Sequence, residues 1–235
     1  MSVAASPQLD SAAPEAVLRW AYESFPRVAI VASFQAESSV LVDMAVRIRP
    51  DVHVLTLDTG RLPQETYDMI DRVRDRYSIE IEVVSPDAGD LAEMVGTHGV
   101  NLFHRSPDLR RLCCEVRKSR PLARALGGYD AWVTGLRRQQ AVTRSQTAVV
   151  ASDPEHEGLT KIAPLASWTK DQVWTYIHEH DLPYHPLYER GFTSIGCEPC
   201  TRATVEGEDE RAGRWWWEQG EVKECGLHWA VSNRE

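Results

Sequence analysis

Short apolar runs alternate with longer amphipathic stretches along the first 134 residues of the chain. The apolar runs lie at residues 28–32, 52–57, 79–84 and 131–134. A strand that is buried on both faces carries apolar side chains at consecutive positions, so these runs predict strands inside a sheet. The amphipathic stretches predict helices after the first strand and at residues 15–24, 63–76, 91–97 and 119–126. This alternation predicts an α/β fold with a doubly wound, mostly parallel sheet.

The loops that follow these strands are expected to form one site. In an open α/β sheet, ligands bind outside the carboxyl ends of the strands. We therefore expect the loops after Ala32, Leu57 and Thr134 to converge on one crevice. Beyond residue 152 the pattern changes to a helix at residues 169–180 and an irregular loop at residues 191–202.

Composition and charge exclude several classes of protein. The 235 residues are 43% hydrophobic and 26% charged, which excludes collagen-like, coiled-coil and disordered chains. No apolar run approaches the roughly 18 residues that a membrane helix needs, and the first residues lack the features of a signal peptide. A formal net charge of −9 argues against a general nucleic-acid binder. We therefore expect a soluble, cytoplasmic enzyme with no membrane and no nucleic-acid partner.

The negative net charge conceals a basic stretch. Residues 105–144 contain ten Lys or Arg and three Asp or Glu, a net charge of +7, whereas the rest of the chain carries −16. A basic stretch within an acidic protein predicts a local site for a small polyanion. A solvated basic helix face is the alternative.

Four of the five cysteines fall into two pairs, Cys113-Cys114 and Cys197-x-x-Cys200. An odd number of cysteines without a secretion signal is not typical of a disulfide framework. Four thiolates suit zinc, but adjacent cysteines cannot form the Cys-x-x-Cys knuckle of a zinc ribbon. An iron–sulfur cluster offers separate iron corners, so the spacing favours a cluster over zinc. Buried, unreactive thiols are a further alternative.

The fifth cysteine, Cys225, lies near the end of the chain between Lys223 and His228. Terminal segments tend to be mobile, so a thiol there can act as a swinging nucleophile. Neighbouring cations would lower its pKa and raise its thiolate fraction. An incidental cysteine is the alternative on these grounds alone.

Other residues are candidates for binding an anion. The loop at residues 33–39 precedes a helix, where amides and hydroxyls can hold an anion, but it lacks the glycines of a Walker loop. An ordinary serine N-cap is the alternative. Lys118 follows Cys114 by one helical turn and would lie beside both the cysteines and a substrate, unless it is simply solvated. Guanidinium groups suit phosphate and sulfate oxygens, and the candidates are Arg137, Arg138, Arg144, Arg211 and Arg214.

Taken together, these motifs resemble the assimilatory adenylylsulfate (APS) reductases. The resemblance runs from about Val28 to His228 and includes residues 57–62 and 134–138. Its most specific elements are the two cysteine pairs and the Glu-Cys-Gly-Leu-His tail around Cys225. It implies reduction of APS to sulfite and AMP with thioredoxin as electron donor, through an S-sulfocysteine on Cys225, in sulfate assimilation and cysteine biosynthesis. It also implies the ATP pyrophosphatase-like fold of the adenine-nucleotide alpha-hydrolases.

The resemblance also assigns roles to individual residues. It implies one [4Fe-4S] cluster per chain, held by Cys113, Cys114, Cys197 and Cys200. Cys225 would be the catalytic thiol, assisted by His228 and Lys118. The implied substrate-binding residues are Ser33, Phe34, Gln35, Glu37, Ser38, Ser39, Asp58, Thr59, Gly60, Arg61, Arg137, Arg211 and Arg214. Phe34 and Gln35 depart from the wider superfamily, which has glycines at these positions.

The expected organisation has three parts. Residues 1–14 are expected to be a disordered N-terminus, residues 15–204 a nucleotide-binding α/β domain with the iron–sulfur site, and residues 205–235 a mobile flap that carries Cys225. A homo-oligomer is among the states that the sequence leaves open.

Three other functions compete with APS reduction. The first is reduction of 3'-phospho-APS (PAPS), by reductases that share the tail but generally lack the cysteine pairs. The second is a zinc-stabilised ATP pyrophosphatase that acts in sulfur transfer. The third is a redox- or metal-sensing binding module, although no nucleic-acid-binding motif is present.

Overall fold

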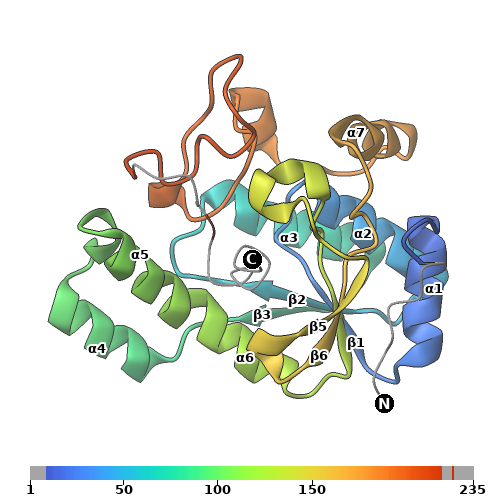
Figure 1. Ribbon diagram of the computed structural model, residues 1–235, viewed down its shortest axis with the longest axis horizontal. Helices are drawn as coiled ribbons and strands as arrows, with labels where there is room; N and C mark the ends of the chain where they lie inside the picture. The colour runs from blue at the N-terminus through green and yellow to red at the C-terminus, as the bar shows by residue number, and fades with distance from the viewer. Residues whose placement is uncertain (1–8, 219–223, 225–235) are drawn as a thin grey trace.

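The computed structural model describes residues 9–218 and 224, and a six-stranded sheet forms its centre (Figure 1). The strands are β1 (Val28–Val31), β2 (His53–Leu57), β3 (Ile81–Val84), β4 (Ala131–Val133), β5 (Val150–Asp153) and β6 (Leu159–Ile162). Their order across the sheet is β3-β2-β1-β4-β6-β5. All neighbouring pairs are parallel except β5 and β6, which are antiparallel. The predicted α/β class and mostly parallel sheet are confirmed.

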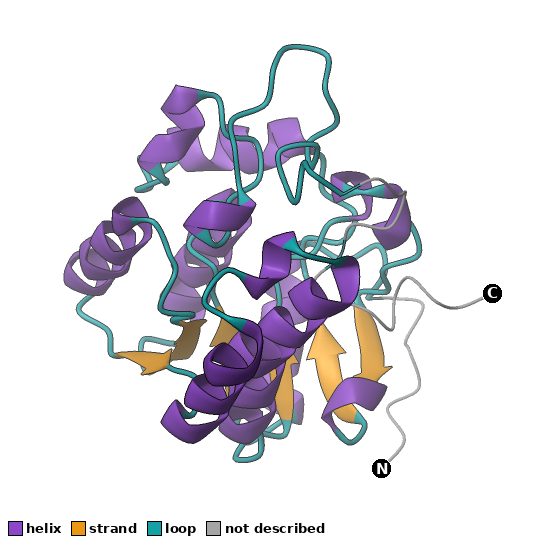
Figure 2. Cartoon of the chain, turned by 90° about the vertical axis from the view of Figure 1, so that its left-hand side faces the viewer, coloured by secondary structure: helices purple, strands orange, loops and turns teal. Residues whose placement is uncertain are grey.

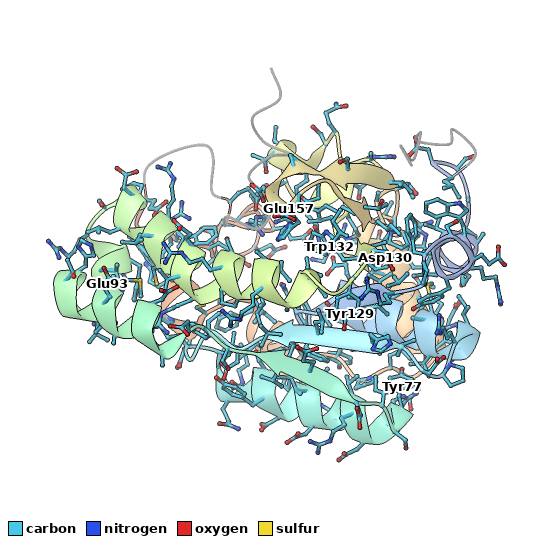
Figure 3. All side chains as sticks on the ribbon, turned by 90° about the horizontal axis from the view of Figure 1, so that it is seen from below. Tyr77, Glu93, Tyr129, Asp130, Trp132 and Glu157 are labelled. Atoms are coloured by element: carbon cyan, nitrogen blue, oxygen red, sulfur yellow. The ribbon has the colours of Figure 1, made fainter. Side chains whose placement is uncertain are left out.

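Helices cover both faces of this sheet (Figure 2). They are α1 (Pro14–Ser24), α2 (Ala36–Ile48), α3 (Gln64–Tyr77), α4 (Ala88–His98), α5 (Pro107–Cys114), α6 (Arg120–Leu126) and α7 (Lys170–Glu179). Side chains at alternate positions of a strand point to opposite faces. Ile30 and Val133 pack with the apolar sides of α1, α2, α3 and α7, whereas Ala29 and Trp132 pack with α6. The central strands are therefore buried on both faces, as their apolar runs predict, and Trp132 of β4 is almost fully buried (Figure 3). The edge strand β3 differs from this expectation, because Val83 is exposed.

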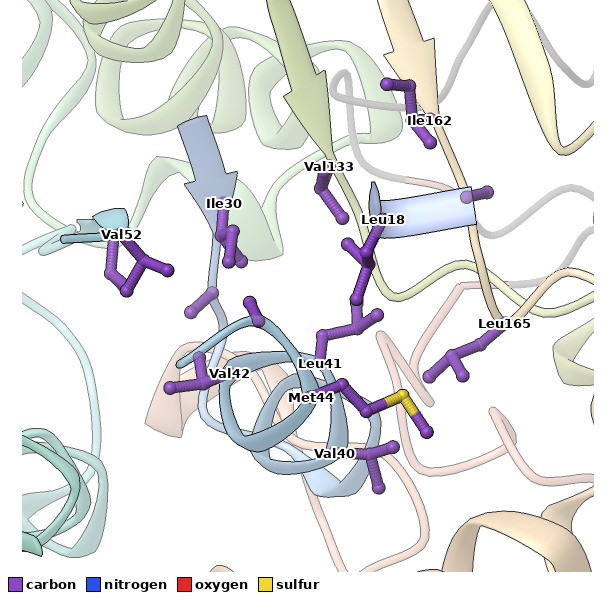
Figure 4. Packing of buried hydrophobic residues seen from close by; sticks show 14 of the residues in the cluster. Leu18, Ile30, Val40, Leu41, Val42, Met44, Val52, Val133, Ile162 and Leu165 are labelled. Atoms are coloured by element: carbon purple, nitrogen blue, oxygen red, sulfur yellow. The ribbon is translucent and has the colours of Figure 1, made fainter. Parts of the chain in front are cut away.

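The larger core lies between the sheet and α2. Figure 4 shows Leu41, Val42 and Met44 of α2 among side chains of the strands and of Leu18 from α1. Consecutive positions of α2 are buried from Ala36 to Ala45, so this helix is enclosed on nearly all sides. It begins directly after the loop that follows β1, and its packing fixes that loop at the carboxyl end of the strand.

Helices α5 and α6 belong to one long helical segment, on the side of the molecule where α4 also lies (Figure 1). Ser106 caps α5 by accepting a hydrogen bond from the amide of Leu109, and Pro107 occupies the first turn. A π-helical turn, Glu115–Ser119, then joins α5 to α6. Such wide turns re-aim side chains within a helix and are frequent at functional sites. This one carries Lys118, immediately after the cysteines that end α5.

Among the described residues, no helix is both long and apolar enough to span a membrane.

Candidate active site

A cavity of about 170 Å³ lies at the carboxyl ends of the parallel strands. Its walls include Ser33 after β1, Thr59 after β2 and Gly135 after β4, so the three loops converge as expected. We call it the sheet-end cavity. The substrate-binding and catalytic candidates that line it are Ser33, Gln35, Glu37, Ser38, Thr59, Lys118, Arg211 and Arg214.

Side-chain hydrogen bonds hold the loop after β1 in place. The Oγ atom of Ser38 accepts a hydrogen bond from the amide of Ser33 at 3.0 Å, and the two hydroxyl oxygens are 3.2 Å apart. The amide of Ile195 donates to Oε1 of Gln35 at 2.7 Å. These contacts join the loop to the segment that leads to Cys197, so the loop after β1 and the second cysteine pair are fixed to each other.

Phe34 and Ser39 do not line the cavity. Phe34 has a φ of 54°, in the left-handed region that favours glycine, and its ring is fully buried in the main core. A glycine would adopt this conformation at less cost, in keeping with the glycine that the resemblance implies at this position in the wider superfamily. Ser39 is also buried, inside α2. Both residues therefore support the loop from behind.

Arg137 lies behind the cavity wall in a buried ionic network. Its Nε donates to Oε1 of Glu37 at 2.7 Å, and its Nη2 donates to Oε1 of Glu210 at 3.1 Å. Burial opposes the charge of Arg137, but Glu37 and Glu210 outweigh it and raise the pKa of the guanidinium. Glu37 and Glu210 line the cavity, while Arg137 acts on it through them.

The loop after β2 turns most of its polar groups away from the cavity. The carboxylate of Asp58 accepts hydrogen bonds at 2.8 Å from the amide of Gly60 and from the hydroxyl of Tyr67. Burial and this carboxylate raise the pKa of Tyr67 to about 12. Arg61 donates to the carbonyl of Val100 at 2.6 Å. Of the four predicted residues 58–61, only Thr59 reaches the sheet-end cavity.

All four paired cysteines line a second pocket, which they share with Phe103 and four cationic side chains, Arg61, Arg110, Arg117 and Lys118. Cys113 and Cys114 come from the end of α5, and Cys197 and Cys200 from the irregular loop. All four are buried, and Phe103 and Trp215 pack around them. We call this the cysteine pocket. The sequence separation of the two pairs is therefore bridged by the fold.

The four thiols have different electrostatic surroundings. Burial raises the pKa of Cys113 and raises that of Cys200 to about 11. Burial also opposes ionisation of Cys197, but the charge of Lys118 and a contact with the Thr59 hydroxyl at 3.3 Å outweigh it and lower its pKa. Across residues 9–218 and 224, no three Cys, His, Asp or Glu side chains gather closely enough to hold one metal ion.

Lys118 lines both the sheet-end cavity and the cysteine pocket. The π turn places it there, one turn beyond Cys114. An ammonium group in this position acts on a thiolate on one side and on an anionic ligand on the other.

A family model described as the phosphoadenosine phosphosulfate reductase domain matches residues 27–203. The chain belongs to this family. It is 47% identical over 214 residues to a protein of Burkholderia cepacia named adenosine 5'-phosphosulfate reductase, covering 91% of this chain and 85% of the relative. A protein of the same name from Allochromatium vinosum is 48% identical over 201 residues, covering 86% and 78%.

Solved structures agree with this family assignment. A phosphoadenylyl-sulfate reductase from Candida auris, in a phosphate complex, superposes with a TM-score of 0.71 at 29% identity, covering 86% of this chain and all of that one. An FMN adenylyltransferase from Candida glabrata, bound to FAD and pyrophosphate, gives 0.58 at 14% identity, covering 93% and 74%. The latter likeness shows the fold alone. The fold is adenine-nucleotide alpha-hydrolase-like, as predicted.

Two further arginines, Arg211 and Arg214, line the sheet-end cavity on the side of residues 210–215. Arg211 and Arg214 approach the ring of Trp215, with guanidinium carbons 6.0 and 4.8 Å from its centre. The guanidinium of Arg214 also fills the space beside Gly196 where a side chain would otherwise lie. The guanidinium of Arg214 therefore stacks on the ring of Trp215 and occupies the space that the absent side chain of Gly196 leaves open.

Two residues at this site have no role in the sequence-based prediction. They are Gln140, which lines the cavity, and Glu224, whose carboxylate contacts Arg144 and Arg211. Arg144 was predicted as an anion-binding candidate and Glu224 belongs to the tail motif, so both carried a signal. Nothing in the sequence showed that the two would meet. The predicted catalytic residues Cys225 and His228 lie outside the described residues.

Proposed function

We propose that this chain reduces adenosine 5'-phosphosulfate to sulfite and AMP, with thioredoxin as electron donor, in the cytoplasmic assimilation of sulfate toward cysteine. One observation carries the proposal. A cavity at the nucleotide-binding end of the sheet and a pocket of four cysteines meet at Lys118, in a chain 47–48% identical to proteins named for this reaction.

The charges around the cavity suit an anionic nucleotide. APS carries negative charge on its phosphate and its sulfate, and Lys118, Arg211 and Arg214 supply positive charge at the wall. Guanidinium groups bind such oxygens through paired hydrogen bonds. The adenosine part would lie among the loops after β1 and β2, with Ser33, Ser38 and Thr59 as polar contacts. Cationic side chains also reduce the repulsion between an anionic substrate and a thiolate.

The chemistry proceeds in two steps with Cys225 as nucleophile. In the first, the thiolate attacks the sulfate sulfur, an S–S bond forms, the S–O bond to the phosphate breaks, and AMP leaves. In the second, one thiol of thioredoxin attacks the Cys225 sulfur and displaces sulfite. The second thiol of thioredoxin then releases Cys225, and thioredoxin becomes a disulfide. Two electrons pass from thioredoxin to the sulfur that leaves as sulfite, and His228 would assist the proton balance at Cys225.

The four buried cysteines fit an iron–sulfur cluster better than a single zinc ion. A zinc site needs four sulfurs about 2.3 Å from one ion, whereas a cluster spreads its ligands over separate irons. Cys113 and Cys114 are adjacent in the sequence, which a Cys-x-x-Cys zinc knuckle does not allow, and the four cysteines line one pocket. Cys113, Cys114, Cys197 and Cys200 would hold a [4Fe-4S] cluster. When bound, such a cluster would order this side of the fold and tune the electrostatic potential near Lys118.

The cysteine pocket also favours APS over its 3'-phosphorylated form as substrate. PAPS reductases generally lack the cysteine pairs, whereas here all four cysteines converge. The test compares sulfite production from APS and from PAPS by purified, iron-loaded protein with thioredoxin. We expect APS to be reduced at least about tenfold faster. Equal or faster reduction of PAPS would overturn the substrate assignment, and pyrophosphate release from ATP would favour a pyrophosphatase instead.

A further inference from the structure

Glu224 precedes Cys225 by one residue in the sequence, and its side chain binds two arginines of the sheet-end cavity wall. Its carboxylate accepts a paired contact from Arg144, at 2.9 Å from Nε and 2.8 Å from Nη2. It also accepts hydrogen bonds from Nη2 of Arg211 at 3.1 Å and from the hydroxyl of Thr143 at 2.9 Å. Both arginines line the cavity.

We infer that Glu224 is a positioning residue that anchors the chain to Arg144 and Arg211, one residue before the nucleophile, and thereby promotes the first step of APS reduction. The inference rests on the proposed function, because it needs Cys225 to be the attacking thiol. Consecutive Cα atoms are only about 3.8 Å apart, so fixing residue 224 limits where residue 225 can be.

Burial and charge make this anchor specific. The side chain of Glu224 is 1% exposed, and that of Arg144 is 8% exposed. A buried carboxylate without partners is very costly, so this one is stable here only while the arginines face it. Burial opposes its ionisation, but the hydrogen bond from Arg144 and the charge of Arg211 outweigh it and lower the pKa of Glu224. The anchor is therefore a charged one at neutral pH.

The arginine that grips Glu224 is itself held in place. Its Nη1 donates to Oε1 of Gln140 at 2.7 Å, and the Gln140 side-chain amide donates to Glu37 at 2.9 Å. Glu37 in turn accepts from the buried Arg137. A continuous chain of hydrogen bonds thus runs from Glu37 in the first turn of α2 to Glu224, so the anchor point is fixed relative to the cavity.

Arg110 contacts the backbone of Glu224 and the side chain of Glu218. Its Nη1 donates to the backbone carbonyl of Glu224 at 3.0 Å, and its Nε donates to the carboxylate of Glu218 at 2.6 Å. The guanidinium lies over Trp215, with its carbon 4.4 Å from the ring centre, and lines the cysteine pocket. Glu224 is therefore secured through its backbone and its side chain by two different parts of the site.

The two steps of the reaction place opposite demands on this anchor. Attack on APS needs the thiol at the cavity, where holding it in place raises its effective concentration. Attack by thioredoxin needs the modified cysteine to be accessible to a second protein. Removing the charge of Glu224 should therefore slow the first step and leave the second unchanged.

The test compares Glu224→Gln with the wild type and with Glu206→Gln, a change at an exposed glutamate. The rate of S-sulfocysteine formation at saturating APS is measured by intact mass, and the rate of sulfite release is measured by adding thioredoxin to the preformed adduct. We expect the first rate to fall about 10- to 100-fold in Glu224→Gln, and the second to stay within about twofold. Glu224→Asp, which keeps the charge, should recover part of the first rate, and Glu206→Gln should match the wild type.

Limited proteolysis without APS separates this inference from the proposed function. Cleavage within residues 219–235 should be at least about fivefold faster in Glu224→Gln than in the wild type or Glu206→Gln. Equal cleavage, an unchanged first step, or equal slowing of both steps would overturn the anchor. If the wild type forms no adduct with APS but the cleavage difference holds, the proposed function fails and the contact of Glu224 with the cavity stands.

Discussion

The sheet-end cavity and the cysteine pocket lie next to each other but differ in how their charges are balanced. Charged residues of the cavity wall pair with residues behind it, Arg144 with Glu224 and Glu37 with Arg137. The described residues that line the cysteine pocket include no Asp or Glu, but they include four cations beside the thiols: Arg61, Arg110, Arg117 and Lys118. Lys118 belongs to both.

This difference suggests a division of labour. Paired charges hold arginines in fixed positions, which suits recognition of phosphate and sulfate. Cations around the four thiols offset the negative charge that thiolate ligands would carry, which suits the proposed cluster. Both regions can therefore stabilise negative charge, the first on a ligand and the second on thiolates.

Replacing one of the four proposed cluster ligands should remove the cluster from the cysteine pocket. Cys200→Ser should lose the brown colour, the bound iron and acid-labile sulfide, and reduce sulfite production at least about 10³-fold. Iron and sulfide analysis with visible absorption checks the prediction. Cys225→Ser is the matched control, since it should keep the cluster while losing sulfite release. A Cys200→Ser protein that retained a full cluster would contradict the ligand assignment.

Lys118 tests the boundary between the two regions. Lys118→Ala should lower kcat/KM for APS by about 10²-fold, because a cation next to the developing charge is lost, while iron content stays close to wild type. Steady-state kinetics and iron analysis measure the two effects separately. Loss of iron together with activity would show that this lysine belongs to the cysteine pocket only.

A substitution at Gly196 tests the role of Arg214 in the sheet-end cavity without replacing the arginine itself. A Cβ atom at this position would collide with the guanidinium of Arg214, so Gly196→Ala should displace that group and raise KM for APS about tenfold. Gly96→Ala is the matched control, because a Cβ there meets nothing within 4 Å. An unchanged KM in Gly196→Ala would mean that Arg214 does not bind the substrate in this position.

The last prediction concerns the pH dependence of the free energy of unfolding, and we expect little effect on catalysis. His185 is fully buried, hydrogen-bonds to Thr66 in the cavity wall at 3.0 Å, and has its pKa lowered by burial to about 4. The unfolded chain takes up a proton near pH 6.5 and the folded one only near pH 4, so the stabilisation is present above pH 6.5 and is lost as the pH falls toward 4.

Denaturant unfolding at several pH values measures this effect. The free energy of unfolding should fall by about 3 kcal/mol more in the wild type than in His185→Asn between neutral pH and the folded pKa. Equal pH dependence in both proteins would show that His185 titrates normally.

The sequence predicted four strands, β1 to β4, and missed β5 and β6. Residues 28–32 and 131–134 are apolar at consecutive positions because β1 and β4 are buried on both faces. In contrast, β5 and β6 mix polar and apolar residues at consecutive positions, so no clear pattern marks them. Helix α5 was also missed, because its eight residues are too few for a helical period to be recognised in the sequence.

The site shows the same limit. Cys113 and Cys197 could be predicted as site residues from residue type and spacing, and the fold brings them together. Phe34, Asp58 and Arg61 occupy motif positions, yet packing and local hydrogen bonds turn their side chains away from the cavity. Glu224 and Arg144 meet only through tertiary structure, which single-sequence patterns do not contain.

The covalent step on Cys225 gives the most direct test of the proposed mechanism. Iron-loaded protein is incubated with APS in the absence of thioredoxin, and its intact and peptide masses are measured. We predict the mass of one SO₃ group on Cys225, an equal amount of AMP, and loss of the adduct as sulfite once thioredoxin is added. AMP and sulfite formation with no adduct on Cys225, or the same adduct in Cys225→Ser, would contradict it.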